Sequence, residues 1–192
     1  MNDHFQNYFL KSIEVKKLCL KNGFAELDKM GRLISNSIKK GGKLMLCGNG
    51  GSAADAQHLA AELLVRLRPN FSRIPLPAIA LAQDTSTLTA CGNDFSFNEI
   101  FSRNLEALGK KADCLLVIST SGNSENIYKA ILVGKKMGIK VFGFFGNRGG
   151  KCISKCDNSF LVPSSNTAAI QEAHITAGHA LMHLIEDNVF KS

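Results

Sequence analysis

The chain has 192 residues, of which 45% are hydrophobic, enough to build the core of a compact domain. Its 23 Lys and Arg outnumber its 16 Asp and Glu, and the formal net charge of +7 attracts anionic ligands. No run reaches the ~18 apolar residues that span a bilayer. Because the N-terminus also lacks the basic and apolar regions of a signal peptide, we expect a cytoplasmic protein.

Neither the basic residues nor the cysteines form a recognisable binding motif. The lysines are scattered, apart from short doublets, and this favours a phosphorylated metabolite over nucleic acid as the anion. The six cysteines contain no CxxC pair, which argues against a thiolate zinc site and favours reduced thiols.

A helical arm precedes the first predicted strand. Apolar positions recur at steps of three and four residues from residue 3 to about 40, and Gly41-Gly42 ends this region. The arm has no sheet of its own to cover, so we expect it to pack beside the sheet or against another subunit. We predict one domain over 1–192, with a helical extension over 1–42 and an α/β core over 43–192.

Short apolar strands alternate with helices in the core. The predicted strands are 43–48, 77–82, 114–120, 141–146 and 159–163, and the predicted helices are 52–67, 85–91, 97–109, 124–137 and 168–189. This order is typical of an α/β fold with a doubly wound, mainly parallel five-stranded sheet and helices on both faces. Ligands of such folds bind outside the carboxyl ends of the strands, where this chain has its Gly- and Ser-rich turns.

The most informative stretch is 47–62. Three glycines follow the first strand and allow a ligand to approach the backbone closely, and Ser52 is predicted as the N-cap of the next helix. A helix N-terminus binds anions readily. His58 and Glu62 are spaced i, i+4 and share one helix face, where they form either a surface pair or a pair that handles protons or binds a metal.

A second polar loop, 118–126, follows the third strand and reads Ile-Ser-Thr-Ser-Gly-Asn-Ser-Glu-Asn. Its hydroxyls and backbone N–H groups suit an oxyanion, although the same residues also cap helices that have no ligand. Two such loops at one edge of the sheet favour a phosphate site. Neither a GxxxxGK[ST] motif nor a GxGxxG motif is present, so a sugar phosphate is favoured over a nucleotide or dinucleotide.

The last predicted helix carries Gln171, His174, His179 and His183. On a straight helix Gln171 and His179 point about 80° apart and are separated by ~12 Å, a long span for one metal centre. Gln171 therefore either precedes the regular helix or acts mainly on substrate. His179 and His183 form a rival i, i+4 pair, but His183 lies among apolar residues and is expected to be a buried packing residue, while His174 could approach the site.

Three further polar positions follow strands or begin helices. Gly92-Asn93-Asp94 is a plain turn on its composition. Asp84 is well placed after the second strand but has weaker support as a site residue. Asp55 is explained by the helix dipole, because it lies in the first turn of its helix.

Together these motifs resemble the sugar isomerase (SIS) domain family and, within it, the phosphoheptose isomerases. The resemblance covers nearly the whole chain and rests on Gly48-Asn49-Gly50-Gly51-Ser52, Gly92-Asn93-Asp94, Ser119-Thr120-Ser121-Gly122-Asn123-Ser124 and Ile170-Gln171-Glu172 through His179. It implies isomerisation of sedoheptulose 7-phosphate to D-glycero-D-manno-heptose 7-phosphate through an enediol, as the first step toward nucleotide-activated heptoses for lipopolysaccharide or capsule. It also implies a homotetramer with active sites between subunits.

The same resemblance assigns roles to individual residues. It implies Glu62 and His179 as the acid–base pair, and one zinc ion per subunit on His58, Glu62, Gln171 and His179. It implies substrate contacts at Asn49, Gly50, Gly51, Ser52, Glu62, Asn93, Asp94, Ser119, Thr120, Ser121, Ser124 and Gln171. The acid–base and zinc roles of Glu62 compete, because a carboxylate bound to zinc is a poorer base. The chain has Ala168-Ala169 where relatives are expected to carry a charged residue.

Two other functions are compatible with the motifs. A non-catalytic SIS-type module that senses a sugar phosphate or docks a protein partner would keep the serine loop without the acid–base pair. Because Glu62 and His179 are both present, the enzyme is favoured. An isomerase for another sugar phosphate, such as a pentose phosphate, is set aside only by the resemblance.

Overall fold

Short runs of Leu, Val, Ile and Phe form the sheet at the centre of the molecule. The computed structural model describes residues 3–191, and within them five strands form one sheet in the order β2-β1-β3-β4-β5, with every neighbouring pair parallel. The strands are β1 (Leu44–Gly48), β2 (Ala78–Ala80), β3 (Cys114–Ser119), β4 (Lys140–Gly146) and β5 (Asn158–Val162). Each end lies within two residues of its predicted position.

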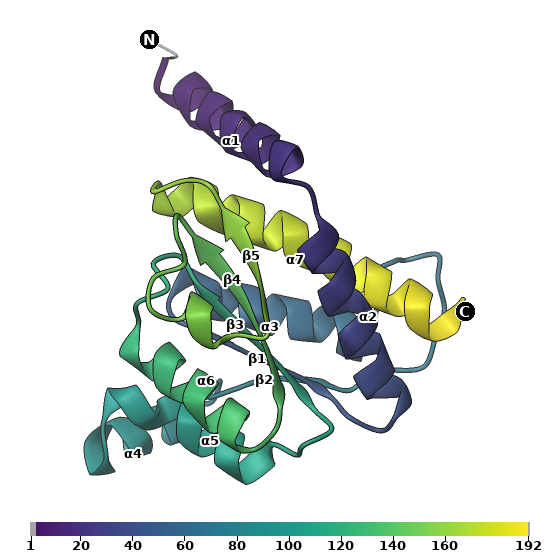
Figure 1. Ribbon diagram of the computed structural model, residues 1–192, viewed down its shortest axis with the longest axis vertical. Helices are drawn as coiled ribbons and strands as arrows, with labels where there is room; N and C mark the ends of the chain where they lie inside the picture. The colour runs from purple at the N-terminus through teal and green to yellow at the C-terminus, as the bar shows by residue number, and fades with distance from the viewer. Residues whose placement is uncertain (1–2, 192) are drawn as a thin grey trace.

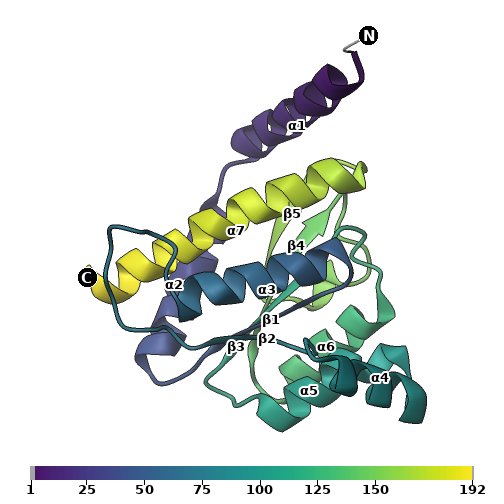
Figure 2. The same cartoon turned by 180° about the vertical axis from the view of Figure 1, so that it is seen from behind.

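Helices cover both faces of this sheet (Figures 1 and 2). They are α1 (Asp3–Asn22), α2 (Ala25–Lys39), α3 (Gly51–Leu64), α4 (Thr85–Asp94), α5 (Ile100–Leu108), α6 (Glu125–Lys136) and α7 (Thr167–Phe190), with short 3-10 helices η1 (Phe97–Glu99) and η2 (Ile153–Lys155). Alternate strand residues enter two cores: Leu44 and Leu46 pack with α2, α3 and α7, whereas Met45 and Cys47 pack with α4, α5 and α6. The predicted doubly wound α/β fold is confirmed.

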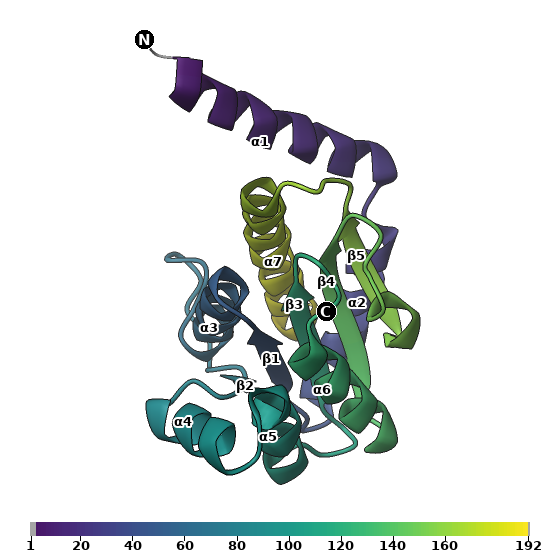
Figure 3. The ribbon, with the colours of Figure 1, turned by 90° about the vertical axis from the view of Figure 1, so that its left-hand side faces the viewer.

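The predicted helical arm consists of two helices joined at Gly23, whose φ of 73° is left-handed. Helix α2 packs against α7, while α1 projects from the body of the molecule (Figures 1 and 3). Apolar side chains on α1 remain exposed, among them Phe5 at 72% and Phe9 at 73%. Within residues 3–191, no helix combines the length and the apolar character needed to cross a bilayer.

The start of α3 differs from its prediction. The helix begins at Gly51, and its N-cap is Gly50 with φ of 55°, a conformation that glycine adopts easily. The N-cap prediction for Ser52 is therefore wrong: Ser52 lies in the first turn, 3% exposed. The helix also ends at Leu64, three residues before its predicted end.

Helix α4 is longer than predicted and includes Gly92-Asn93-Asp94, so these residues do not form the plain turn that their composition allows. Asp84 is the N-cap of this helix, and its carboxylate accepts a hydrogen bond of 2.7 Å from the backbone N–H of Thr87. This hydrogen bond, the main cause, lowers the pKa of Asp84. Asp84 thus has a structural role as the N-cap of α4.

Helices α3 and α7 lie side by side on one face of the sheet (Figures 2 and 3). They are in close contact at Gly178, which is buried: a Cβ added there would lie 2.6 Å from Cδ1 of the fully buried Leu59. The neighbours of these two residues in the chain are His58 and His179. The missing side chain at position 178 therefore brings the two histidines within reach of each other.

We predict that Gly178→Ala lowers the free energy of unfolding by about 1–3 kcal/mol, because the added methyl group overpacks the contact with Leu59. Gly92→Ala is the matched control, since a Cβ at Gly92 meets no atom within 4 Å. It should leave stability unchanged or raise it by up to about 1 kcal/mol. Urea denaturation of both variants measures the difference, and equal stabilities would contradict the close contact.

Candidate active site

A small polar cavity lies where the strand order reverses. Strands β1 and β3 are neighbours, and the chain leaves them toward opposite faces of the sheet, so their carboxyl ends form the switch point at which such folds bind ligands. The cavity has a volume of about 70 Å³. Apart from Ile118 its lining is polar: Asn49, Ser52, Ser119, Thr120, Ser121, Ser124 and Gln171. The two predicted polar loops thus meet in one cavity.

The serine hydroxyls of the second loop are oriented by the backbone. Ser119 Oγ accepts a hydrogen bond of 3.1 Å from Gly122 N–H, and Ser121 Oγ accepts one of 3.2 Å from Asn123 N–H. A hydroxyl that accepts in this way keeps its own proton for a ligand. Ser124 is the N-cap of α6, yet its side chain makes no capping hydrogen bond within the described structure. These hydroxyls can therefore donate to an oxyanion.

A reciprocal amide pair joins the two loops. Asn49 Nδ2 donates to Asn126 Oδ1 at 2.9 Å, and Asn126 Nδ2 donates back to Asn49 Oδ1 at 2.8 Å. Asn126 is 2% exposed and also accepts a hydrogen bond from Ile127 N–H. No local sequence pattern marks Asn126 as a site residue, because its partner lies 77 residues away. This pair fixes Asn49 at the edge of the cavity.

Gln171 closes the cavity from α7. Its amide packs so tightly on the backbone of Gly51 that a Cβ at Gly51 would lie 2.5 Å from Gln171 Nε2. A larger residue at position 51 would displace the amide of Gln171 from this contact. Gln171 lies inside the regular helix α7, so the suggestion that it precedes this helix is wrong.

A second cluster lies farther along α3 and α7. His58 Nε2 is 2.8 Å from His179 Nε2 and 3.1 Å from Glu62 Oε1. The exposed fraction is 49% for the His58 side chain and 16% for that of Glu62. One ligand atom from each of the three residues lies within 4.8 Å of the others. The structure thus brings together three of the four predicted metal ligands and both predicted acid–base residues.

The donor set of this cluster fits a divalent metal. Two imidazole nitrogens 2.8 Å apart repel each other through their lone pairs unless a proton or a cation lies between them. Two histidine nitrogens and one carboxylate oxygen are a common ligand set of catalytic zinc, which keeps one position open. The three residues can therefore hold zinc or share a proton.

Asp55 lies one helical turn before His58 and was set aside on sequence grounds. Its Oδ2 is buried and has no hydrogen-bond partner among the described residues. Burial raises the pKa of Asp55, and the nearby His58 and His179 partly oppose this shift. The helix dipole alone does not account for a carboxyl oxygen in this position.

Other predicted residues lie elsewhere. Asn93 and Asp94 are exposed, with Asn93 Nδ2 donating to Asp94 Oδ1 at 2.8 Å, and neither lines the polar cavity. His174 is buried against Phe144, where burial lowers its pKa to about 4. The prediction of a buried His183 is wrong: its side chain is 50% exposed.

Comparisons with known proteins identify the family of the chain. A model of the SIS domain family matches residues 7–146. The chain is 44% identical over 192 residues to a phosphoheptose isomerase of Clostridium acetobutylicum, a match that covers 99% of this chain and 97% of that protein.

Solved structures give the same result. A phosphoheptose isomerase from Francisella tularensis is 37% identical and superposes with a TM-score of 0.92 over 96% of this chain and 97% of its own. The phosphoheptose isomerase from Neisseria gonorrhoeae is 37% identical, with a TM-score of 0.90 over 97% and 98% of the two chains. The chain therefore belongs to the SIS domain family and, within it, to the group of the phosphoheptose isomerases.

Proposed function

We propose that this protein interconverts sedoheptulose 7-phosphate and D-glycero-D-manno-heptose 7-phosphate. The observation that carries the proposal is the presence of an anion cavity and an acid–base cluster on the same pair of helices. Ser52 and Gln171 line the cavity, whereas His58, Glu62 and His179 form the cluster. The names of the relatives support the same reaction.

The spacing of the two sites supports a long sugar phosphate. Ser52 and His58 are six residues apart on α3, which is about 9 Å along the axis, and Gln171 and His179 on α7 are about 12 Å apart. An extended seven-carbon sugar with its phosphate in the cavity places C1 and C2 near the cluster. A pentose phosphate is shorter by two carbons.

The cavity binds the phosphate in this proposal. The hydroxyls of Ser52, Ser119, Thr120, Ser121 and Ser124 donate to its oxygens, together with the backbone of Gly50 and Gly51. Asn49 and Gln171 act on the substrate from the edge of the cavity, where both lie. Contacts of Asn93 and Asp94 with the sugar hydroxyls stay a prediction from the resemblance.

Glu62 and His179 move the protons. Glu62 removes a proton from C1 of the ketose while His179 protonates the oxygen on C2, and the C1–H electron pair becomes the double bond of the enediol. Return of the proton from Glu62 to C2, with loss of the proton on the C1 oxygen to His179, gives the aldose. The 2.8 Å and 3.1 Å contacts of His58 hold both groups at one point between the helices.

We further propose that His58, Glu62 and His179 hold a zinc ion, and that the contacts of Glu62 and His179 with the ion are partial, so that both groups still exchange protons with the substrate. A bound zinc ion would polarise the carbonyl group and stabilise the negative charge that develops on its oxygen. Gln171 is assigned to substrate here, because it lines the phosphate cavity about two helical turns away from His179.

We propose that the protein forms a homotetramer in which other subunits shield the cluster from water. His58 is half exposed in the single chain, although proton transfer at carbon requires water to be excluded. The exposed apolar side chains of α1, such as Phe5 and Phe9, are suited to an interface between copies of the chain. The cytoplasmic location stays a prediction.

Turnover of sedoheptulose 7-phosphate tests the function. We expect the wild-type protein to convert this substrate. Glu62→Gln and His179→Gln should each lower kcat by about 10²–10⁴-fold, because each substitution removes one acid–base group. Circular dichroism checks that both variants are folded. If both retain wild-type turnover, the acid–base assignment is wrong. If the wild type has none while it still binds the sugar phosphate, the non-catalytic module is the correct function.

Metal removal tests the zinc proposal separately. Treatment with a chelator should abolish turnover, and added Zn²⁺ should restore it, because the carbonyl group loses its electrostatic stabilisation without the ion. Metal content by mass spectrometry accompanies each assay. If chelator-treated protein contains no metal and still turns over the substrate at the wild-type rate, the zinc proposal is refuted. Glu62 and His179 would then act as an acid–base pair without a metal.

Light scattering tests the assembly. We expect a mass four times the 20.8 kDa of the chain, and a smaller mass for Phe9→Asp, because a charge at this 73% exposed position opposes an apolar interface. A monomeric wild type that is fully active would contradict a site between subunits.

A further inference from the structure

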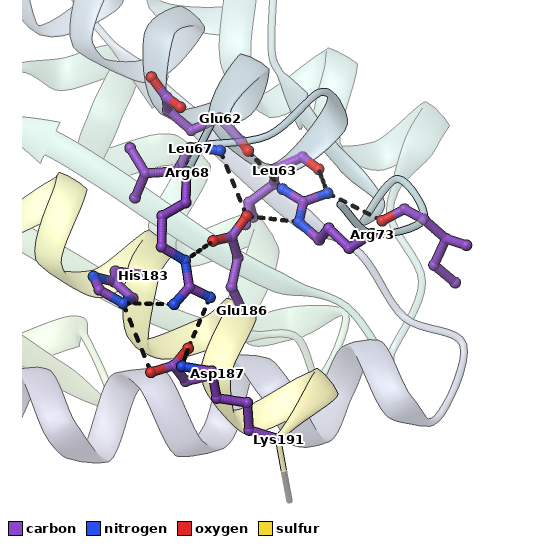
Figure 4. Close-up of polar contacts among 10 residues, drawn as sticks. Glu62, Leu63, Leu67, Arg68, Arg73, His183, Glu186, Asp187 and Lys191 are labelled. Atoms are coloured by element: carbon purple, nitrogen blue, oxygen red, sulfur yellow. Dashed lines mark hydrogen bonds and ion pairs between the residues drawn. The ribbon is translucent and has the colours of Figure 1, made fainter. Parts of the chain in front are cut away.

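A fully buried carboxylate on α7 binds two arginines from the loop that follows α3 (Figure 4). Glu186 Oε1 lies 2.6 Å from Arg73 Nε, and Glu186 Oε2 lies 2.9 Å from Arg68 Nε. The exposed fraction is 0% for the Glu186 side chain and 1% for that of Arg73. A charge pair this deeply buried persists only with good geometry and further hydrogen bonds.

Those further hydrogen bonds go to the end of α3. Arg73 Nη2 donates to the carbonyl oxygen of Glu62 at 2.7 Å, and Arg73 Nη1 donates to that of Leu63 at 2.8 Å and to that of Ile74 at 3.0 Å. The last carbonyl groups of a helix have no partner within it. The guanidinium group of Arg73 therefore caps the final turn of α3, which carries Glu62.

The ion pair of Arg73 with Glu186 also holds α7, because Glu186 belongs to that helix. Glu186 follows His179 by seven residues, about two turns or roughly 10 Å along the helix. One guanidinium–carboxylate pair thus joins the turn that bears Glu62 to the helix that bears His179, as Figure 4 shows for the Glu62 end.

We propose that Arg73 and Glu186 are positioning residues for the acid–base cluster, which set the place of Glu62 relative to His179. This inference rests on the proposed function. Among the described residues, no hydrogen bond or ion pair joins Arg73 or Glu186 to the side chains of the cluster, so both act through the backbones of α3 and α7. Arg68 has a lesser part: its side chain is 21% exposed, and it contacts His183 and Asp187 on the surface of α7.

Arg73→Lys separates the two functions of the side chain. A lysine ammonium can still pair with Glu186, but it lacks the planar fork that reaches the carbonyl groups of Glu62 and Leu63 at the same time. We expect kcat to fall by about tenfold to a hundredfold, because small displacements of reacting groups are costly. KM should change little, since the phosphate cavity lies at the other end of the helices.

Zn²⁺ affinity, measured by competition with a chromogenic chelator, gives a readout that does not depend on turnover. Arg73→Lys should weaken it by about tenfold to a hundredfold, as loss of outer-shell support does at metal sites.

Asp113→Asn is the matched control. Asp113 has a side chain that is 2% exposed, pairs with Lys43 Nζ at 2.6 Å, and accepts from the backbone N–H of Lys43 and Lys110. It precedes β3, at the amino edge of the sheet and away from the cluster. Asp113→Asn should lower the Tm while leaving kcat and Zn²⁺ affinity unchanged.

Wild-type kcat and Zn²⁺ affinity in Arg73→Lys would overturn the proposal, as would equal losses in Asp113→Asn. If Arg73→Lys does not fold, Glu186→Gln is used instead, because it keeps the size of the side chain. We expect the same losses of kcat and of Zn²⁺ affinity for this variant. A wild type without turnover would refute the proposed function instead, and the Zn²⁺ measurement would still decide the positioning role.

Discussion

The close contact of α3 and α7 is the constraint on which the rest of the site depends. Glycine at 178 allows Leu59 to pack directly against the backbone of α7, and the adjacent residues His58 and His179 then face each other at 2.8 Å. A larger residue at this position would separate the helices before the histidines could meet. Close packing therefore determines the chemistry available at this surface.

The sheet supplies the second half of the site. Its order β2-β1-β3-β4-β5 places the ends of β1 and β3 side by side, and the amide pair of Asn49 and Asn126 holds the two loops together there. Both helices that carry the cluster also reach this cavity, through Ser52 on α3 and Gln171 on α7. In the proposed function, the substrate lies along the two helices, with its phosphate at one end and its reacting carbons at the other.

Local patterns explain which parts of this arrangement the sequence could predict. The apolar runs that form the strands and the glycine- and serine-rich loops carry their information within a few residues, so both were located correctly. The partner of Asn126 lies 77 residues away, and Arg73 bonds to Glu186 across 113 residues. No local pattern marks such residues. His183 was misplaced because apolar neighbours suggested burial, although the buried residues Leu181, Met182 and Ile185 lie on a different side of α7.

The most direct test of the central claim follows hydrogen during the reaction. Sedoheptulose 7-phosphate is incubated with the enzyme in D₂O, and the aldose is analysed by NMR. Proton transfer through an enediol by Glu62 and His179 predicts stereospecific deuterium at C2 of the product, because the acid–base groups exchange with solvent. Product with only hydrogen from C1 at that position, under all conditions, would indicate direct hydride transfer and contradict the account.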